Sequence, residues 1–163
     1  ELDIEVETEG LIYLGTGTQQ IFNTTFNPTL NENYLYIRVQ DASNIRISIG
    51  SVAANIAIDL AINNVIKMVG PAIYVNDVLK ATLSPAAPAI TFYEDSLLGA
   101  ASFGGITGYL TGSILRAKIQ GETFLLDEKS GYEGYGSLGS KGLRNTSNAA
   151  GLTYINSTMI VKL

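Results

Sequence analysis

Apolar and charged residues alternate along the first nine positions of the chain. The apolar positions are Leu2, Ile4 and Val6, and the acidic ones are Asp3, Glu5, Glu7 and Glu9. A period of two places these two kinds of side chain on opposite faces of a β-strand. The pattern therefore predicts an amphipathic strand, continued by an apolar run at residues 11–14 and followed by a hinge-like break at Gly15-Thr16-Gly17-Thr18.

The same period of two recurs along much of the chain. Alternating or β-branched runs are found at residues 34–39, 45–49, 56–62, 65–69, 90–93 and 152–163. A tight turn is predicted at Asn76-Asp77, between apolar runs at residues 72–75 and 78–83, and another at Gly121-Glu122, between runs at residues 114–120 and 123–126. A third is predicted at Asn63-Asn64. Residues 51–69 also keep a four-residue apolar spacing, but isoleucine and valine dominate them, so we expect strands there. The glycine-rich residues 129–151 are predicted to form a long surface loop.

Roughly ten short strands separated by turns, with no convincing helix, predict an all-β fold. The expected architecture is an antiparallel β-sandwich, immunoglobulin-like or pilin-like, with an extended N-terminal strand. We expect residues 1–14 to form an N-terminal arm and residues 15–163 to form the sandwich domain.

The composition excludes several kinds of chemistry. The chain has no histidine and no cysteine, so it has no Ser-His-Asp or Cys-His machinery, no zinc site of the nitrogen and sulfur kind, and no disulfide. Two carboxylate pairs, Glu94-Asp95 and Asp127-Glu128, leave a hydrolase as an alternative, although neighbours on a strand point to opposite faces. The acidic residues of the first strand are spaced about 6.6–6.8 Å apart, too widely for one calcium ion. We expect a protein that is not an enzyme, with no cofactor and no metal.

The net charge of −5 is concentrated at the N-terminus. Five acidic residues lie among the first nine, and the rest of the chain carries ten acidic and ten basic residues. Such asymmetry is typical of an interaction arm, and the lack of a basic stripe argues against binding to nucleic acid. One long uncharged run, Ser96–Leu115, is half glycine, serine and threonine, so we expect no membrane span there.

Two features suggest export to the cell exterior. The chain begins at Glu1, as expected after removal of a leader peptide. Acceptor sequons for N-linked glycans begin at Asn23, Asn145 and Asn156.

The first strand has two interpretations. In one, it is an ordinary strand of its own sandwich, with its acidic residues facing water. In the other, it leaves its own domain and completes the sheet of a neighbouring copy, with Leu2, Ile4 and Val6 filling pockets in the acceptor. Such a head-to-tail contact does not close on itself and therefore generates a filament.

In these features the sequence resembles the subunits of donor-strand-complemented surface filaments. It is similar to the glycosylated archaeal threads and, more distantly, to bacterial chaperone–usher pilins, which often carry a disulfide that this chain lacks. The resemblance implies an extracellular, glycosylated cell-surface filament for adhesion or cell–cell contact. Its partners would be copies of itself, its donor residues Leu2, Ile4 and Val6, and its glycan sites the three sequon asparagines.

A monomeric secreted module that binds carbohydrate or another surface is the alternative function. Tyr132 and Tyr135 lie in a glycine-rich segment whose composition resembles that of recognition loops. In that case the tyrosine rings would stack on a sugar, and the chain would not polymerise.

Overall fold

The structure is a computed structural model that describes eleven parts of the chain. These are residues 1–24, 34–84, 89–92, 96–99, 101–102, 106–126, 133–135, 137, 141–144, 152–155 and 159–161. Over these residues the secondary structure consists of strands and turns, without a helix, which confirms the predicted all-β class. None of the described residues forms a helix long and apolar enough to cross a membrane.

Two antiparallel sheets contain most of the strands. The first sheet has the order β14 (Glu122–Phe124), β13 (Ser113–Ile119), β1 (Asp3–Glu9), β6 (Asn64–Val69), β7 (Ala72–Val75) and β8 (Val78–Thr82). The second has the order β15 (Glu133–Tyr135), β16 (Lys141–Arg144), β17 (Leu152–Ile155), β10 (Ser96–Leu98), β2 (Gln19–Asn23), β3 (Leu35–Asp41), β4 (Asn44–Ile49) and β5 (Val52–Ala57). Two short pairs complete the described strands: β11 (Ala101–Ser102) with β12 (Ile106–Thr107), and β9 (Ile90–Phe92) with β18 (Met159–Val161).

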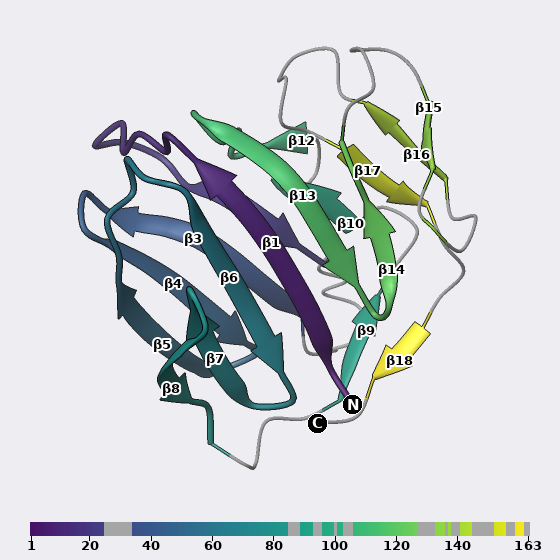
Figure 1. The fold of residues 1–163 in the computed structure, drawn as a ribbon, viewed down its shortest axis with the longest axis horizontal. Coiled ribbons are helices and arrows are strands. Elements are labelled where there is room, and N and C mark those ends of the chain that lie inside the picture. The colour runs from purple at the N-terminus through teal and green to yellow at the C-terminus, as the bar shows by residue number, and fades with distance from the viewer. Residues whose placement is uncertain are drawn as a thin grey trace.

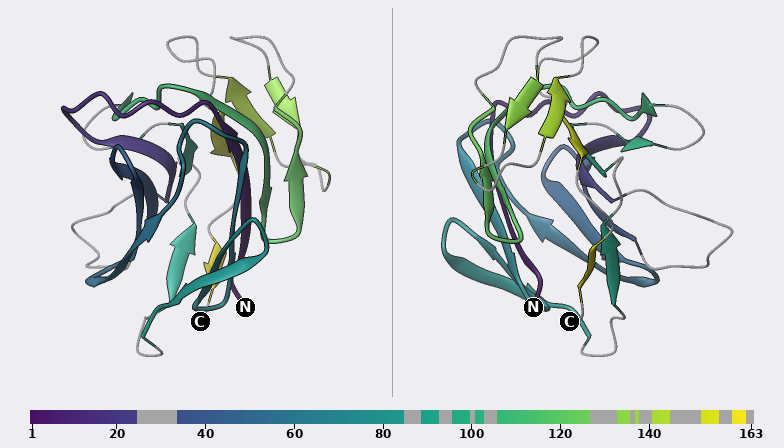
Figure 2. Two further views of the ribbon diagram at one scale, coloured as in Figure 1. Left: turned by 60° about the vertical axis from the view of Figure 1, so that its left-hand side comes forward. Right: turned by 90° about the vertical axis from the view of Figure 1, so that its right-hand side faces the viewer.

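The two large sheets face each other as the layers of a sandwich (Figures 1 and 2). Inward-pointing side chains from both layers form one core, because alternate residues of each strand point the same way. Strands β3 and β6 show this alternation, with buried residues at every second position. Strand β2 is buried along its whole length, and the bulge between Gln20 and Phe22 accounts for two adjacent core residues, Ile21 and Phe22.

The predicted hairpin at Asn76-Asp77 is confirmed. Both turn residues have positive φ, 51° and 62°, which is the conformation that a two-residue type I′ turn requires. The hairpin predicted at Gly121-Glu122 exists, but its turn lies one residue earlier, at Gln120 (φ 53°) and Gly121 (φ 84°). Glu122 instead begins β14 and is buried.

The predicted turn at Asn63-Asn64 is wrong. Strand β5 ends at Ala57 and pairs with β4, whereas β6 begins at Asn64 and pairs with β1, so the two strands belong to different sheets. The Asn64 amide donates to the carbonyls of Asp59 (2.7 Å) and Ile62 (3.1 Å) and thereby holds a crossing loop. The predicted loop at 129–151 is also partly wrong, because it contains β15 and β16.

The two type I′ turns predict reciprocal effects on stability. Asp77 is a non-glycine residue at φ 62°, whereas Gly121 occupies the matching second position of the other turn, where an added Cβ would meet no atom within 4 Å. We expect Asp77→Gly to stabilise the fold by about 0.5–1 kcal/mol and Gly121→Asp to destabilise it by a similar amount. Urea unfolding of both variants measures this, and shifts of the same sign would contradict the turn assignment.

Candidate assembly site: the N-terminal arm and its groove

The N-terminal strand lies in the middle of the first sheet, not at its edge. Strand β1 pairs antiparallel with β6 on one side and with β13 on the other (Figure 1). These two neighbours are separated by more than forty residues along the chain. In the single chain the arm, residues 1–14, therefore fills a slot between β6 and β13, which we call the groove.

The apolar face of the arm points into the core. Leu2, Ile4 and Val6 are each fully buried. Ile4 lies between Met68 of β6 and Ile119 of β13, whereas Val6 lies between Ile66 and Ala117. The predicted donor residues are thus inward-facing side chains at the centre of the sandwich.

The burial of these three residues is large compared with the stability of a domain. Each contributes about 1.5–3 kcal/mol on burial, so together they contribute on the order of 5–9 kcal/mol before opposing terms are counted. A typical domain is stable by only about 5–15 kcal/mol. The contribution of the arm is thus comparable to the whole stability of a typical domain.

Backbone and side-chain hydrogen bonds fasten the start of the arm on both sides. The Gly70 N–H donates to the Leu2 carbonyl at 2.7 Å, from the β6 side. From the β13 side, the Gln120 N–H donates to the Asp3 carbonyl at 2.7 Å, and the Asp3 N–H donates to Gln120 Oε1 at 2.6 Å. Gln120 Nε2 also donates to the Glu1 carbonyl at 3.2 Å.

The acidic face of the arm carries ion pairs and is not simply solvated. Arg116 Nη2 lies 2.7 Å from Glu5 Oε1, and Arg116 Nε lies 3.6 Å from Glu7 Oε2. Lys118 Nζ lies 2.8 Å from Asp3 Oδ2. The hydrogen bond to Asp3 and its negative charge raise the pKa of Lys118 above its usual value. The expectation that these acidic residues face water alone is therefore incomplete.

Hydrogen bonds also hold the end of the arm, just before the glycine-containing segment begins. The Leu11 N–H donates to the Leu60 carbonyl at 2.9 Å, and the Ile12 N–H donates to the Thr111 carbonyl at 3.0 Å. The buried Gln19 side chain binds Ile12 and Leu14 as well, donating to the Ile12 carbonyl at 2.8 Å and accepting from the Leu14 N–H at 3.0 Å.

The segment after the arm is exposed and contains two glycines in the left-handed region. Gly15 and Gly17 both have φ 75°, and neither has an atom within 4 Å of the position of an added Cβ. This segment joins β1 in one sheet to β2 in the other. Gly15 and Gly17 are thus free to adopt other backbone conformations without a steric clash, and the hinge at this segment stays a prediction.

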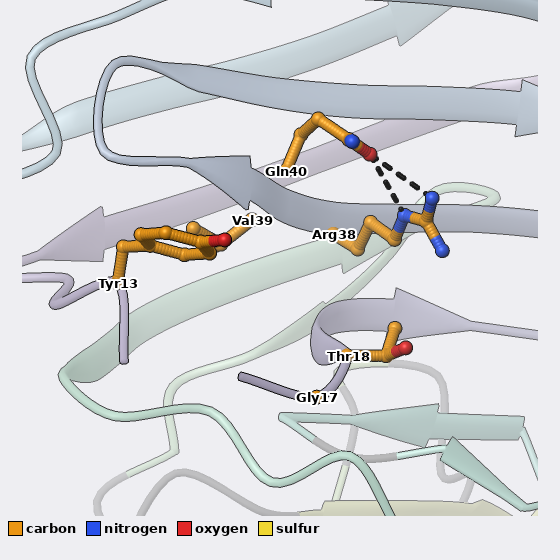
Figure 3. A pocket seen from close by; sticks show the side chains of 6 residues that line it. All are labelled: Tyr13, Gly17, Thr18, Arg38, Val39 and Gln40. Carbon is orange, nitrogen blue, oxygen red and sulfur yellow. Dashed lines mark hydrogen bonds between the residues drawn. The ribbon is translucent and has the colours of Figure 1, made fainter. Parts of the chain in front are cut away.

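A polar hollow of about 240 Å³ lies beside the end of the arm and the glycine-containing segment that follows it (Figure 3). It is lined by one residue before the predicted hinge, two within it and three on β3: Tyr13, Gly17, Thr18, Arg38, Val39 and Gln40. Arg38 donates from Nε (3.2 Å) and Nη2 (3.0 Å) to Gln40 Oε1, and its guanidinium also lies 5.1 Å from the centre of the Tyr36 ring. Arg38 is therefore held in place by side chains of its own strand.

The structure describes only one of the three sequon asparagines. Asn23 is 5% exposed and lies in β2, paired with Tyr36 on one side and Leu97 on the other. A glycan attached to Asn23 would not fit into this packed position. Asn145 and Asn156 lie outside the described residues.

The other sequence-predicted residues contribute little to the described site. Tyr135 lies in β15, and Tyr132 lies outside the described residues, as do Glu94-Asp95 and Asp127-Glu128. Within the described parts of the chain, no three acidic residues come together as a candidate metal site. The basic residues opposite the arm, by contrast, were not anticipated, because only the pairing of strands distant in sequence brings them there.

Comparisons with protein-family models, with curated proteins and with solved structures find no match to this chain.

The attachment of the arm predicts a strong effect at Gly112. This residue has φ 125°, and an added Cβ would lie 2.7 Å from the Gly10 carbonyl oxygen and 2.8 Å from Leu11 Cα. Because backbone atoms of the arm block that position, we expect Gly112→Ala to destabilise the fold by about 2–4 kcal/mol. Gly17→Ala, which meets only the unfavourable φ, is the matched control and should cost about 1 kcal/mol. Equal losses in urea unfolding would show that the arm does not approach Gly112 this closely.

Proposed function

We propose that the protein is a structural subunit that polymerises head-to-tail into an extracellular filament for adhesion or cell–cell contact. Each subunit inserts its arm into the groove of the next. The observation that carries this proposal is that β1 is a central strand of its sheet, between β6 and β13, and is followed by an exposed segment with two left-handed glycines, Gly15 and Gly17. A strand in this position can be replaced by the same strand of a second copy while the other strands of the sheet keep their order.

Removal of the arm would divide the first sheet into two pieces. One piece would be β14 with β13, and the other would be β6 with β7 and β8. The facing edges of β13 and β6 would then expose unpaired backbone groups above an apolar floor. Such edges readily accept an added strand, because each backbone N–H and C=O needs a hydrogen-bond partner.

An arm from a second copy would make the same contacts as the chain's own arm. The choice between the two arrangements then depends on the conformation of the Gly15–Gly17 segment and on protein concentration. An own arm on a short linker has an effective concentration in the millimolar range, so exchange is favoured where subunits are crowded, as at a site of assembly.

Donation between copies is a heterologous contact, since the arm of one subunit meets the groove of another. One end of such an assembly has a free groove and the other end has a free arm. Further subunits can therefore be added, unless the two ends meet and close a ring. The remaining sequons at Asn145 and Asn156 stay in the proposal as glycan sites on the filament surface, whereas Asn23 is left out because it is buried.

A pair of introduced cysteines tests which groove the arm occupies. Glu5 and Lys67 lie opposite each other on β1 and β6 and are both partly exposed. Opposite residues of antiparallel strands have Cα atoms about 4.5–5.5 Å apart, which suits a disulfide, and the chain has no cysteine of its own. After assembly at high concentration and oxidation, we expect Glu5→Cys/Lys67→Cys to give a ladder of covalent oligomers on a denaturing gel without reductant.

Arg46→Cys/Asn55→Cys is the matched control, since these residues are opposite each other on β4 and β5, which do not exchange. It should give monomers with an internal disulfide only. A monomer band alone for the Glu5/Lys67 pair, under conditions in which the control also oxidises fully, would place the arm in its own subunit and contradict the proposal.

A further inference from the structure

The charges of the arm and of its two neighbouring strands are strictly opposite. Strand β1 carries acidic residues and no basic ones. The charged residues of β6 and β13 are all basic, namely Lys67, Arg116 and Lys118. We call these three residues the basic rim of the groove.

The rim surrounds the arm from both sides. Lys67 and Lys118 are both in register with Glu5, one on β6 and the other on β13, while Arg116 is in register with Glu7. The ion pairs run to neighbouring acidic residues as well, because Lys118 binds Asp3 and Arg116 binds both Glu5 and Glu7. A groove without an arm would therefore present three uncompensated positive charges above its apolar floor.

These ion pairs are partly exposed. They affect which strand the groove binds more than how tightly it binds that strand. The Arg116 and Lys118 side chains are 43% and 39% exposed, so water and salt weaken each attraction. Like charges placed opposite each other across strands are nevertheless unfavourable. The rim thus discriminates against basic strands more than it strengthens the binding of the acidic one.

The register of the arm is set by other features. Acidic residues recur at every second position, so a shift by two residues would still place acids beside the rim. Such a shift would, however, move each apolar residue of the arm to the position of its neighbour in the core. It would also displace the fully buried Thr8. The bulge between Glu7 and Thr8 opposite β13 also fixes the alignment.

We propose that the groove selects its occupant by charge, and that the occupant it fits is the acidic arm of a second copy of this chain. This inference rests on the proposed function and adds its specificity. The apolar floor admits a strand with alternate aliphatic residues, and the basic rim favours one whose other face is acidic and disfavours one whose other face is basic. Opposite charge also accelerates the encounter of arm and groove.

Charge reversal on each side tests this selection. In the first variant, Asp3→Lys, Glu5→Lys and Glu7→Lys reverse the arm; in the second, Lys67→Glu, Arg116→Glu and Lys118→Glu reverse the rim. We expect each variant alone to assemble roughly tenfold to a hundredfold more weakly than the unmodified chain, measured by light scattering at low salt. An equal mixture of the two should assemble, and sedimented polymer should contain both in equal amounts. A chain with all six changes should assemble alone.

The outcomes separate this inference from the proposed function. If either variant with three changes assembles as well as the unmodified chain, the rim does not select the occupant. If neither the mixture nor the chain with all six changes regains assembly or monomer stability, the charges do not act as complementary pairs, and the inference is overturned. In a third outcome, the chain with all six changes regains the stability of the unmodified monomer but the mixture does not assemble. Arm and rim then meet within one chain, and it is the proposed function that fails.

Discussion

The insertion of β1 between β6 and β13 is the constraint on which the rest of the structure depends. The arm supplies three fully buried aliphatic residues to the core, Leu2, Ile4 and Val6, and its strand β1 supplies hydrogen-bond partners to two other strands. Without it, one layer of the sandwich separates into two pieces. Any copy of the arm that filled the groove would complete the fold, so the proposed assembly and the stability of the domain depend on the same contacts.

The sequence predicted local features of the fold better than the partners of each strand. Alternation identified the inward face of the arm, and Asn76-Asp77 identified a type I′ hairpin, because both signals lie within a few neighbouring residues. The Asn63-Asn64 turn was wrong because the chain crosses between sheets there, and no local pattern distinguishes a crossing from a hairpin. The strands β15 and β16 were missed because their glycine content is typical of loops.

The sequence predicted the acidic face of the arm but not the basic residues that contact it. The acidic face of the arm was visible as an unusual concentration of charge, but its partners Arg116 and Lys118 lie more than one hundred residues away along the chain. Only the antiparallel pairing of β1 with β13 brings these charges together. The same limitation explains Asn23, whose sequon gives no sign that β3 and β10 enclose it on both sides.

The measurement that tests the central claim most directly is carbodiimide cross-linking of an isotopically mixed assembly. This reagent joins a carboxylate to an amine in direct contact, and Asp3 and Lys118 meet at 2.8 Å. Nitrogen-15-labelled and unlabelled chains would be unfolded together in equal amounts, reassembled at high concentration and cross-linked, and the joined peptides would be weighed by mass spectrometry. Exchange of the arm predicts joined Asp3–Lys118 peptides in which one peptide is labelled and the other is not. Joined peptides that are always both labelled or both unlabelled would show that each arm remains in its own subunit.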